Sequence, residues 1–364
     1  MNRAYDDNQY RAALDDLRFS DAAKQRMTER LLAAAEAEPV VPMRRKRTRR
    51  LPRIAAVGVA AALVLGVGAG ATGVLKTAGE AFAGVFGPTA DTEIIDKIGR
   101  PVGAHDTDNG VTITADAIIG DKYHYAITYS IEKEDGTPFD LDLTQTVGAG
   151  LLPLTFADED TTLVGYRGGA HGSAYFYDAD PTDNAIQYVE TREVSDDTAR
   201  GRTVRARFRD LRAYDEQMQQ MRVVAPGSWS LKFDLDFEDT SIDLPAGQTI
   251  DLNGMTATID QITLSPLALR VDYTVDSEIR WDENATDGRI SAHDSEQMRR
   301  YFEDLPIVVH KKDGSSLDLS NAGGGVHPAD GKTICQKGDI FDEIVPLDEV
   351  ASVAVGGIEI AVQP

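Results

Sequence analysis

The stretch Asp108–Gly136, DNGVTITADAIIGDKYHYAITYSIEKEDG, decides the fold class of this 364-residue chain. Asn109-Gly110 and Asp135-Gly136 are dipeptides that favour tight turns between antiparallel strands. Between them, apolar residues alternate with polar ones, first over 111–117 and then over 123–131. A period of two is typical of β-strands with one apolar and one polar face. The stretch therefore predicts antiparallel sheet covered on one side.

The same alternation continues toward the C-terminus, over 229–237, 250–259 and 267–275. In this part of the chain, helical periodicity is limited to about 293–302. We therefore expect a mainly β chain with two antiparallel β-sandwich domains, 76–240 and 241–364. Residues 133–141 match residues 311–319 at five of nine positions, which indicates either two related domains or two hairpins of similar turn chemistry.

Charge divides the chain into three regions. Residues 1–53 hold 13 Lys and Arg against 8 Asp and Glu, a net charge of +5. Residues 54–75 hold no charged side chain, and residues 76–364 hold 24 basic and 52 acidic residues, a net charge of −28. The overall charge of −23 is unlike that of a nucleic-acid-binding protein, which carries a basic patch. A basic head, an uncharged run and an acidic body are typical of a membrane protein with two aqueous sides.

The uncharged run Ile54–Leu75 is long enough to cross a bilayer. As a helix it extends about 33 Å, against a hydrocarbon core of about 30 Å. Basic residues precede it and acidic sequence follows it, so the positive-inside rule places the N-terminus in the cytoplasm of the cell and the body outside. The basic cluster that sets this topology consists of Arg44, Arg45, Lys46, Arg47, Arg49, Arg50 and Arg53.

Three other interpretations of this run are weaker. A cleaved signal peptide would need a basic leader of about 53 residues and a shorter apolar run. The sequence GAGATG (68–73) matches a dinucleotide-binding fingerprint, but the apolar stretch before it is too long for one strand. A buried soluble helix leaves the one-sided basic flank unexplained. Within a span, Gly66 and Gly70 form a small-xxx-small pair that favours close packing of two helices, unless they simply reflect composition.

The head, residues 1–43, is too short for a core of its own. Its apolar spacing predicts two amphipathic helices, which are not stable without a covering partner. We expect the apolar residues Leu14, Leu17, Met27 and Leu31 to contact a cytoplasmic partner. The acidic residues Asp15, Asp16 and Asp21 would then face a basic surface of that partner. The alternative is a poorly ordered tail.

Residue patterns for catalysis are missing. The six histidines show no metal-ligand spacing, and the chain has neither a phosphate-binding loop nor a nucleophile elbow. The single cysteine, Cys335, falls in a predicted strand and is expected to be a buried thiol. The glycine- and tyrosine-rich segment 165–177 predicts either a long hairpin or a ligand-contacting loop. We therefore expect no enzyme, no cofactor and no metal site.

Several motifs occur together along the chain: LRFSDAAKQR (17–26), the basic cluster and span, FGP (86–88), DNGVTI (108–113), LSPL (264–267) and VASVAVGGIEIAV (350–362). With these motifs the chain resembles the domain-of-unknown-function family 4179, bacterial membrane-anchored proteins similar to anti-sigma factors. The C-terminal half is similar to the immunoglobulin-like domain that often follows in that family.

The resemblance implies a single-pass protein of the bacterial plasma membrane. Its cytoplasmic helices would hold a sigma factor, and its outer immunoglobulin-like domains would sense an envelope signal through a ligand that the sequence does not identify. The head lacks the His/Cys zinc motif of many anti-sigma domains, which is a departure from the pattern. The alternative is a membrane-anchored surface module whose outer domains bind glycan, peptidoglycan or protein.

Overall fold

A computed structural model describes residues 75–86, 92–141, 151–214, 221–282 and 290–363. Within these ranges the chain is mainly β, and none of their helices is long and apolar enough to cross a membrane. The predicted head, basic cluster and span lie outside the described residues, except for Leu75. So do the residues expected to bind a partner, set topology or pack helices: Leu14, Asp15, Asp16, Leu17, Asp21, Met27, Leu31, Arg44, Arg45, Lys46, Arg47, Arg49, Arg50, Arg53, Gly66 and Gly70.

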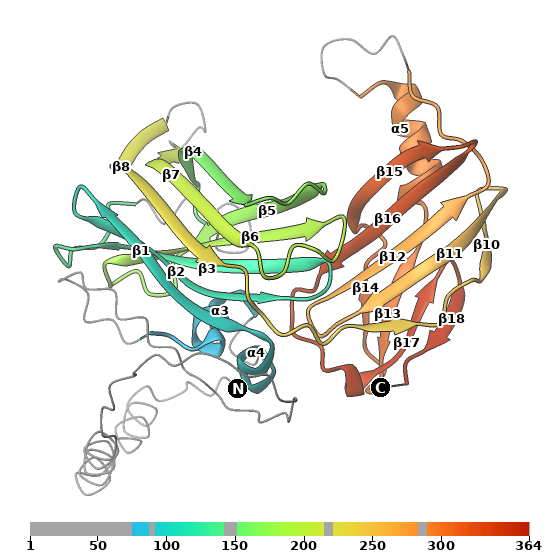
Figure 1. Ribbon diagram of the computed structural model, residues 1–364, viewed down its shortest axis with the longest axis horizontal. Coiled ribbons are helices and arrows are strands. Elements are labelled where there is room, and N and C mark those ends of the chain that lie inside the picture. The colour runs from blue at the N-terminus through green and yellow to red at the C-terminus, as the bar shows by residue number, and fades with distance from the viewer. Residues whose placement is uncertain (1–74, 87–91, 142–150, 215–220, 283–289, 364) are drawn as a thin grey trace, which may run out of the picture. The chain divides into compact units, whose positions relative to one another are not determined.

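The predicted hairpin at Asn109-Gly110 is confirmed and lies within a five-stranded antiparallel sheet (Figure 1). Asn109 and Gly110 have φ angles of 49° and 75°, the left-handed conformation that a two-residue turn needs. The sheet order is β1-β2-β3-β6-β5. Its strands are β1 (Arg100–Asp108), β2 (Val111–Gly120), β3 (His124–Lys133), β6 (Ala185–Val194) and β5 (Ala170–Tyr177).

A three-stranded antiparallel sheet, order β4-β7-β8, shares one hydrophobic core with the five-stranded sheet. Trp229 of this sheet is buried in that core, 1% exposed, and donates its indole N–H to the carbonyl of Val111 at 2.9 Å. In the same core, Tyr129 and Phe208 meet edge to face with ring centroids 5.3 Å apart. The strands are β4 (Leu154–Leu163), β7 (Thr203–Tyr214) and β8 (Met221–Asp234).

Residues from Ile242 onward build a second core between two further antiparallel sheets. The predicted turns at Asn253-Gly254 and Gly356-Gly357 are confirmed as two-residue hairpins. One sheet contains β9 (Ile242–Leu244), β10 (Thr249–Leu252), β11 (Met255–Leu264), β12 (Ala268–Val275), β15 (Gly323–Ala329) and β16 (Lys332–Ile340). The other contains β13 (Ile307–Lys311), β14 (Ser316–Asp318), β17 (Val350–Val355) and β18 (Ile358–Ala361).

The helix predicted near 293–302 is confirmed as α5 (Ala292–Met298), which continues into a π-helical turn over Arg299–Glu303. Ser291 caps its N-terminus by accepting a hydrogen bond from the backbone of Asp294. The fully buried ammonium of Lys337 donates to three carbonyls at the other end, those of Phe302, Glu303 and Leu305, at 3.0–3.2 Å. A 3₁₀ turn, Leu347–Glu349, precedes β17.

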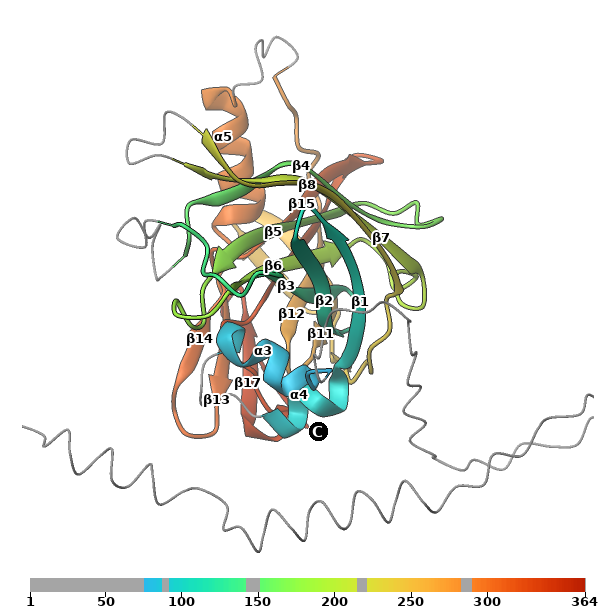
Figure 2. The ribbon, with the colours of Figure 1, turned by 90° about the vertical axis from the view of Figure 1, so that its left-hand side faces the viewer.

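Two short helices, α3 (Ala78–Phe86) and α4 (Thr92–Ile98), pack against the five-stranded sheet on the face opposite the shared core (Figures 1 and 2). The sequence analysis did not predict these two helices within residues 76–240. The expectation of a sheet covered on one side is wrong for β3. Eight consecutive residues of this strand, from His124 to Ile131, are buried, so both of its faces are covered. Polar residues such as Thr128 and Ser130 lie on this second covered face.

Candidate functional site

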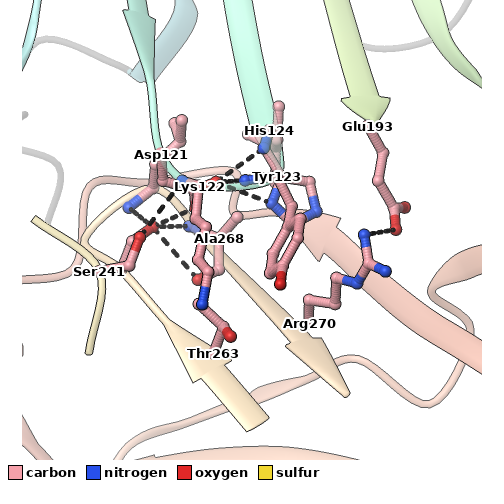
Figure 3. A network of polar contacts seen from close by, with 12 residues as sticks. Asp121, Lys122, Tyr123, His124, Glu193, Ser241, Thr263, Ala268 and Arg270 are labelled. Atoms are coloured by element: carbon pink, nitrogen blue, oxygen red, sulfur yellow. Dashed lines mark hydrogen bonds and ion pairs between the residues drawn. The ribbon is translucent and has the colours of Figure 1, made fainter. Parts of the chain in front are cut away.

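The clearest concentration of buried polar groups joins the turn before β3 to the turn between β11 and β12 (Figure 3). We call it the polar junction and define it by Asp121, His124, Glu193, Ser265 and Arg270. Each of these residues is at most 7% exposed. Charged groups at this depth require partners, because removing them from water is unfavourable. The bonds of the polar junction are therefore the main candidate for a functional device in the described residues.

Asp121 accepts four hydrogen bonds within its own turn and across to the C-terminal region. Its Oδ1 atom accepts from the backbone of Tyr123 at 2.9 Å and of His124 at 2.7 Å, and contacts the His124 Nδ1 atom at 3.1 Å. Its Oδ2 atom accepts from the Ser265 hydroxyl at 2.6 Å. Burial acts to raise the pKa of Asp121, but the His124 ring and the Ser265 hydroxyl outweigh it and hold the pKa below its usual value. Asp121 is therefore an ionised, fully bonded carboxylate.

Ser265 connects this carboxylate to the β11–β12 turn. Its hydroxyl oxygen accepts from the backbone N–H groups of Leu267 at 3.1 Å and Ala268 at 2.9 Å while its proton goes to Asp121. Proline at position 266 cannot donate, so the hydroxyl satisfies the next two N–H groups of the turn. One serine thus fixes the turn shape and bridges two segments 144 residues apart.

Arg270 forms the second bridge. From β12 its guanidinium donates to the carbonyl of Val194 at 2.8 Å and lies 4.0 Å from the ring centroid of Tyr123. It also contacts the Glu193 carboxylate at 3.7 Å and donates through Nε to Asp272 at 2.8 Å. The planar, permanently charged guanidinium suits this combination of stacking and several acceptors. Loss of this side chain would leave two carboxylates without their shared cation.

His124 is the group whose charge can change near neutral pH. It is 3% exposed, and its Nε2 atom has no hydrogen-bond partner among the described residues. Burial lowers the pKa of His124, but the carboxylate of Asp121 raises it more, so the pKa lies above its usual value of 6.5. Glu193 adds to this rise and Arg270 opposes it. On β5, the exposed His171 contacts Glu193 at 3.1 Å, and that bond raises its pKa.

The arrangement does not form a nucleophilic triad, although serine, histidine and aspartate are all present. The Ser265 hydroxyl donates to the Asp121 carboxylate, whereas a triad serine donates to the imidazole. The described part of the chain also contains no cluster of three or more potential metal ligands. What the polar junction does offer is a set of charge-dependent bonds between two β regions.

Exposed pairs lie around the junction. Lys122 contacts the carboxylate of Asp243 at 3.3 Å, and Arg100 contacts Glu238 at the same distance. Such solvent-exposed pairs contribute little free energy because water and salt screen them.

Two further expectations have structural outcomes. Cys335 is fully buried in β16, so the prediction of a buried thiol is confirmed, and burial raises the pKa of the thiol to about 12. The segment 165–177 contains the edge strand β5.

An open depression of about 480 Å³ lies beside the Asn109-Gly110 turn. It is lined by Asn109, Gly110, Val111, Lys133, Glu134, Asp135, Phe139, Val224, Ala225 and Pro226.

None of the residues of the polar junction was among the candidate site residues from the sequence. The available signals were local turn signals: Gly120-Asp121 before the tyrosine-rich strand, and LSPL at 264–267. Each predicts a turn, but nothing in the sequence indicates that the two turns meet. The pairing across 144 positions is visible only in the structure.

Comparison with known proteins adds little to this geometry. No family model matches the sequence, and no curated protein matches it. Among solved structures, the chain is similar to a conserved domain protein from Bacillus anthracis, with a TM-score of 0.43 and 15% sequence identity. The similarity covers 71% of this chain and 76% of that one.

Proposed function

We propose that the chain is a single-pass signalling protein of a bacterial plasma membrane, of the anti-sigma-factor type. The head would sequester a sigma factor in the cytoplasm, and the body would sense an envelope signal outside through two immunoglobulin-like β-sandwich domains. The observation that carries the proposal is the charge partition: +5 before an uncharged run of membrane-spanning length and −28 after it. The proposal needs no enzyme chemistry and no cofactor.

The described body supports a sensing role in one respect. Its two large cores meet through charge-dependent bonds rather than through apolar packing alone. Buried polar contacts are sensitive to local electrostatics, because a lost partner leaves a charge unpaired. A ligand that competes for such groups would change how the two regions are held, which is the property that a sensor needs.

Topology is tested first by cysteine labelling of the full-length chain in whole bacterial cells. In a Cys335→Ala background, Ser20→Cys places one thiol in the head and Thr182→Cys places one on the exposed surface of the body. A membrane-impermeant maleimide should label Thr182→Cys in intact cells and Ser20→Cys only after lysis. Labelling of both thiols in intact cells would contradict the single-pass arrangement.

Sigma-factor binding is tested by transcription in the native host. Deletion of the gene should raise one compact set of transcripts that includes a sigma-factor gene, and the full-length chain should restore the original level. A chain with Leu14, Leu17, Met27 and Leu31 all changed to Ala should fail to restore it, whereas a control with Gln9→Ala and Gln25→Ala should succeed. A flat transcriptome after deletion would remove the anti-sigma interpretation.

The second candidate function is a membrane-anchored surface binding module. The depression beside the Asn109-Gly110 turn favours it, because apolar side chains such as Val111 and Phe139 lie there together with Glu134 and Asp135. In that case deletion of residues 1–43 leaves the cellular phenotype unchanged. Phe139→Ala would then weaken attachment to the cell wall or to a surface partner without changing transcription.

A further inference from the structure

The helix pair α3–α4 is seated by residues from both β regions at once. Phe82 and Ile95, both fully buried, belong to one apolar cluster with residues of β2, β3 and the C-terminal region. This third cluster is smaller than the two main cores and separate from them. Its members are Ala78, Ala81, Phe82, Phe86, Ile95, Ile98, Ala117, Ile119, Ala126, Leu267, Ala268 and Ile344.

Two glycines at the helix pair have no room for a side chain. A Cβ atom on Gly99 would lie 2.7 Å from Ala78 Cβ and 2.7 Å from Ile119 Cγ2, and a Cβ atom on Gly84 would lie 2.6 Å from the ring of Tyr177. Such distances are far inside ordinary van der Waals contact. The two helices are therefore closely fitted to the surface beneath them, and a small displacement of that surface affects them directly.

We call the residues of this apolar cluster that lie outside α3 and α4 the helix seat. The polar junction holds the C-terminal residues of the helix seat. The Ser265 hydroxyl accepts hydrogen bonds from the N–H groups of Leu267 and Ala268, which belong to the same apolar cluster as the helices, and donates its own proton to Asp121. On the other side of the junction, Ala126 lies two residues after His124 in β3. Residues of the apolar cluster therefore lie within two or three positions of residues that form the charge-dependent bonds.

The helix pair also follows directly after the predicted span. Lys76 donates its ammonium to the Ser130 hydroxyl at 3.0 Å and contacts the buried carboxylate of Asp116 at 3.6 Å. α3 then begins at Ala78. Any change in how the helices are seated is therefore passed to residue 75 through only a few backbone bonds.

Neither helix is long enough to persist without its seat. α3 has nine residues and α4 has seven, well below the length at which isolated helices are stable in water. Their stability comes from the apolar side chains that they bury. Order in this segment is thus conditional on the surface beneath it, in the manner of the ordered and released segments of other switches.

We propose that α3 and α4 form a releasable element whose seat is completed by the polar junction, so that opening the junction frees the helix pair and changes the chain next to the predicted span. The release itself is a property of the described body. Its use as a signal rests on the proposed function above.

The test measures labelling of single cysteines in the purified full-length chain with Cys335 changed to Ala. Ala81→Cys reports on the helix seat, since Ala81 is 7% exposed, and the exposed position Glu80→Cys gives the rate for an open site. Ala225→Cys, 3% exposed in the main N-terminal core, reports on global unfolding. Adding Ser265→Ala should raise the labelling rate at Ala81→Cys at least tenfold and leave the rate at Ala225→Cys unchanged.

Thr263→Val is the matched control. Thr263 is also buried and also donates its hydroxyl to an aspartate, Asp243 at 2.8 Å, but it does not belong to the helix seat. It should leave labelling at Ala81→Cys within twofold of the parent. The comparison therefore separates loss of the junction bond from loss of any buried hydroxyl in β11 or the turn after it.

Three outcomes would overturn the proposal. Unchanged labelling at Ala81→Cys with Ser265→Ala would show that the junction bond does not hold the seat. Faster labelling at Ala268→Cys without a change at Ala81→Cys would show that the helices stay in place when the junction opens. A parallel rise at Ala225→Cys would show that the body unfolds as one unit. Because no sigma factor is present, these results are independent of the transcriptional test.

Discussion

The sheets that share the N-terminal core differ in how they meet solvent. On β7, buried and more exposed residues alternate along most of the strand, so one face of the three-stranded sheet remains in water. On β3, both faces are buried, one by the shared core and the other by the small cluster that contains α3, α4 and C-terminal residues. Alternation in sequence is similar in both strands. The comparison teaches that a polar strand face is not always exposed to solvent, because another part of the chain can cover it.

The largest loss of stability is expected where the polar junction loses the cation that pairs with Glu193, a residue of the doubly covered five-stranded sheet. Arg270→Ala removes the cation shared by Glu193 and Asp272, whose side chains are 7% and 18% exposed. An unpaired buried charge destabilises a protein by about 3–5 kcal/mol. Urea denaturation of the full-length chain should show a loss of this size. A loss below about 1 kcal/mol would mean that the junction is open to water.

A substitution in the small apolar cluster of α3 and α4 should cost a similar free energy of unfolding, but its effect should be confined to one part of the molecule. Phe82→Ala removes a fully buried ring and leaves a cavity, which costs about 3–5 kcal/mol in a closed core. Because α3 and α4 are short, we expect the loss to appear mainly as faster hydrogen exchange in 78–98, with less effect on exchange in β7. Equal acceleration in both segments would show that the helices belong to a single cooperative unit.

Hairpins were predictable because their signals are local. Asn109-Gly110 and Asn253-Gly254 combine the residues that accept positive φ with flanking strand patterns, and both form the expected turns. The helix pair was not predictable in this way. Its helices have only nine and seven residues, and the first of them is rich in alanine and glycine. Both belong to an apolar cluster with residues such as Ala268 that are distant in sequence. The polar junction was missed for the same reason.

The two titrating groups of the polar junction, Asp121 and His124, should contribute to stability over different pH ranges. Asp121 has a lowered pKa, so its stabilisation is present above its unfolded value of 3.8 and is lost as the pH falls through the folded pKa. His124 has a raised pKa, so its stabilisation is fully present below 6.5 and is lost as the pH rises through the folded pKa. Arg270, Glu193, His171 and Asp339 also act on this ring or its neighbours.

Thermal unfolding followed between pH 5 and pH 9 should therefore show stability falling on the alkaline side of 6.5. His124→Gln should flatten that fall, because it removes the group that loses its proton, whereas His327→Gln should leave the profile unchanged. His327 lies in the edge strand β15 and is not part of the polar junction. If stability still falls at alkaline pH in His124→Gln, a group other than His124 causes the fall.

The smallest loss of stability is expected for a substitution on the solvent-exposed face of β7. Arg207 forms an ion pair with Asp160 on β4, and the two side chains are 65% and 40% exposed. It matches Arg270 in residue type and in lying on a strand, but exposed pairs contribute only about 0–1 kcal/mol because water screens them. Arg207→Ala should therefore lower the free energy of unfolding by less than about 1 kcal/mol, and added salt should remove what difference there is. If Arg207→Ala cost as much as Arg270→Ala, this face of β7 would itself be covered in the full-length protein, and the distinction between the two sheets would fail.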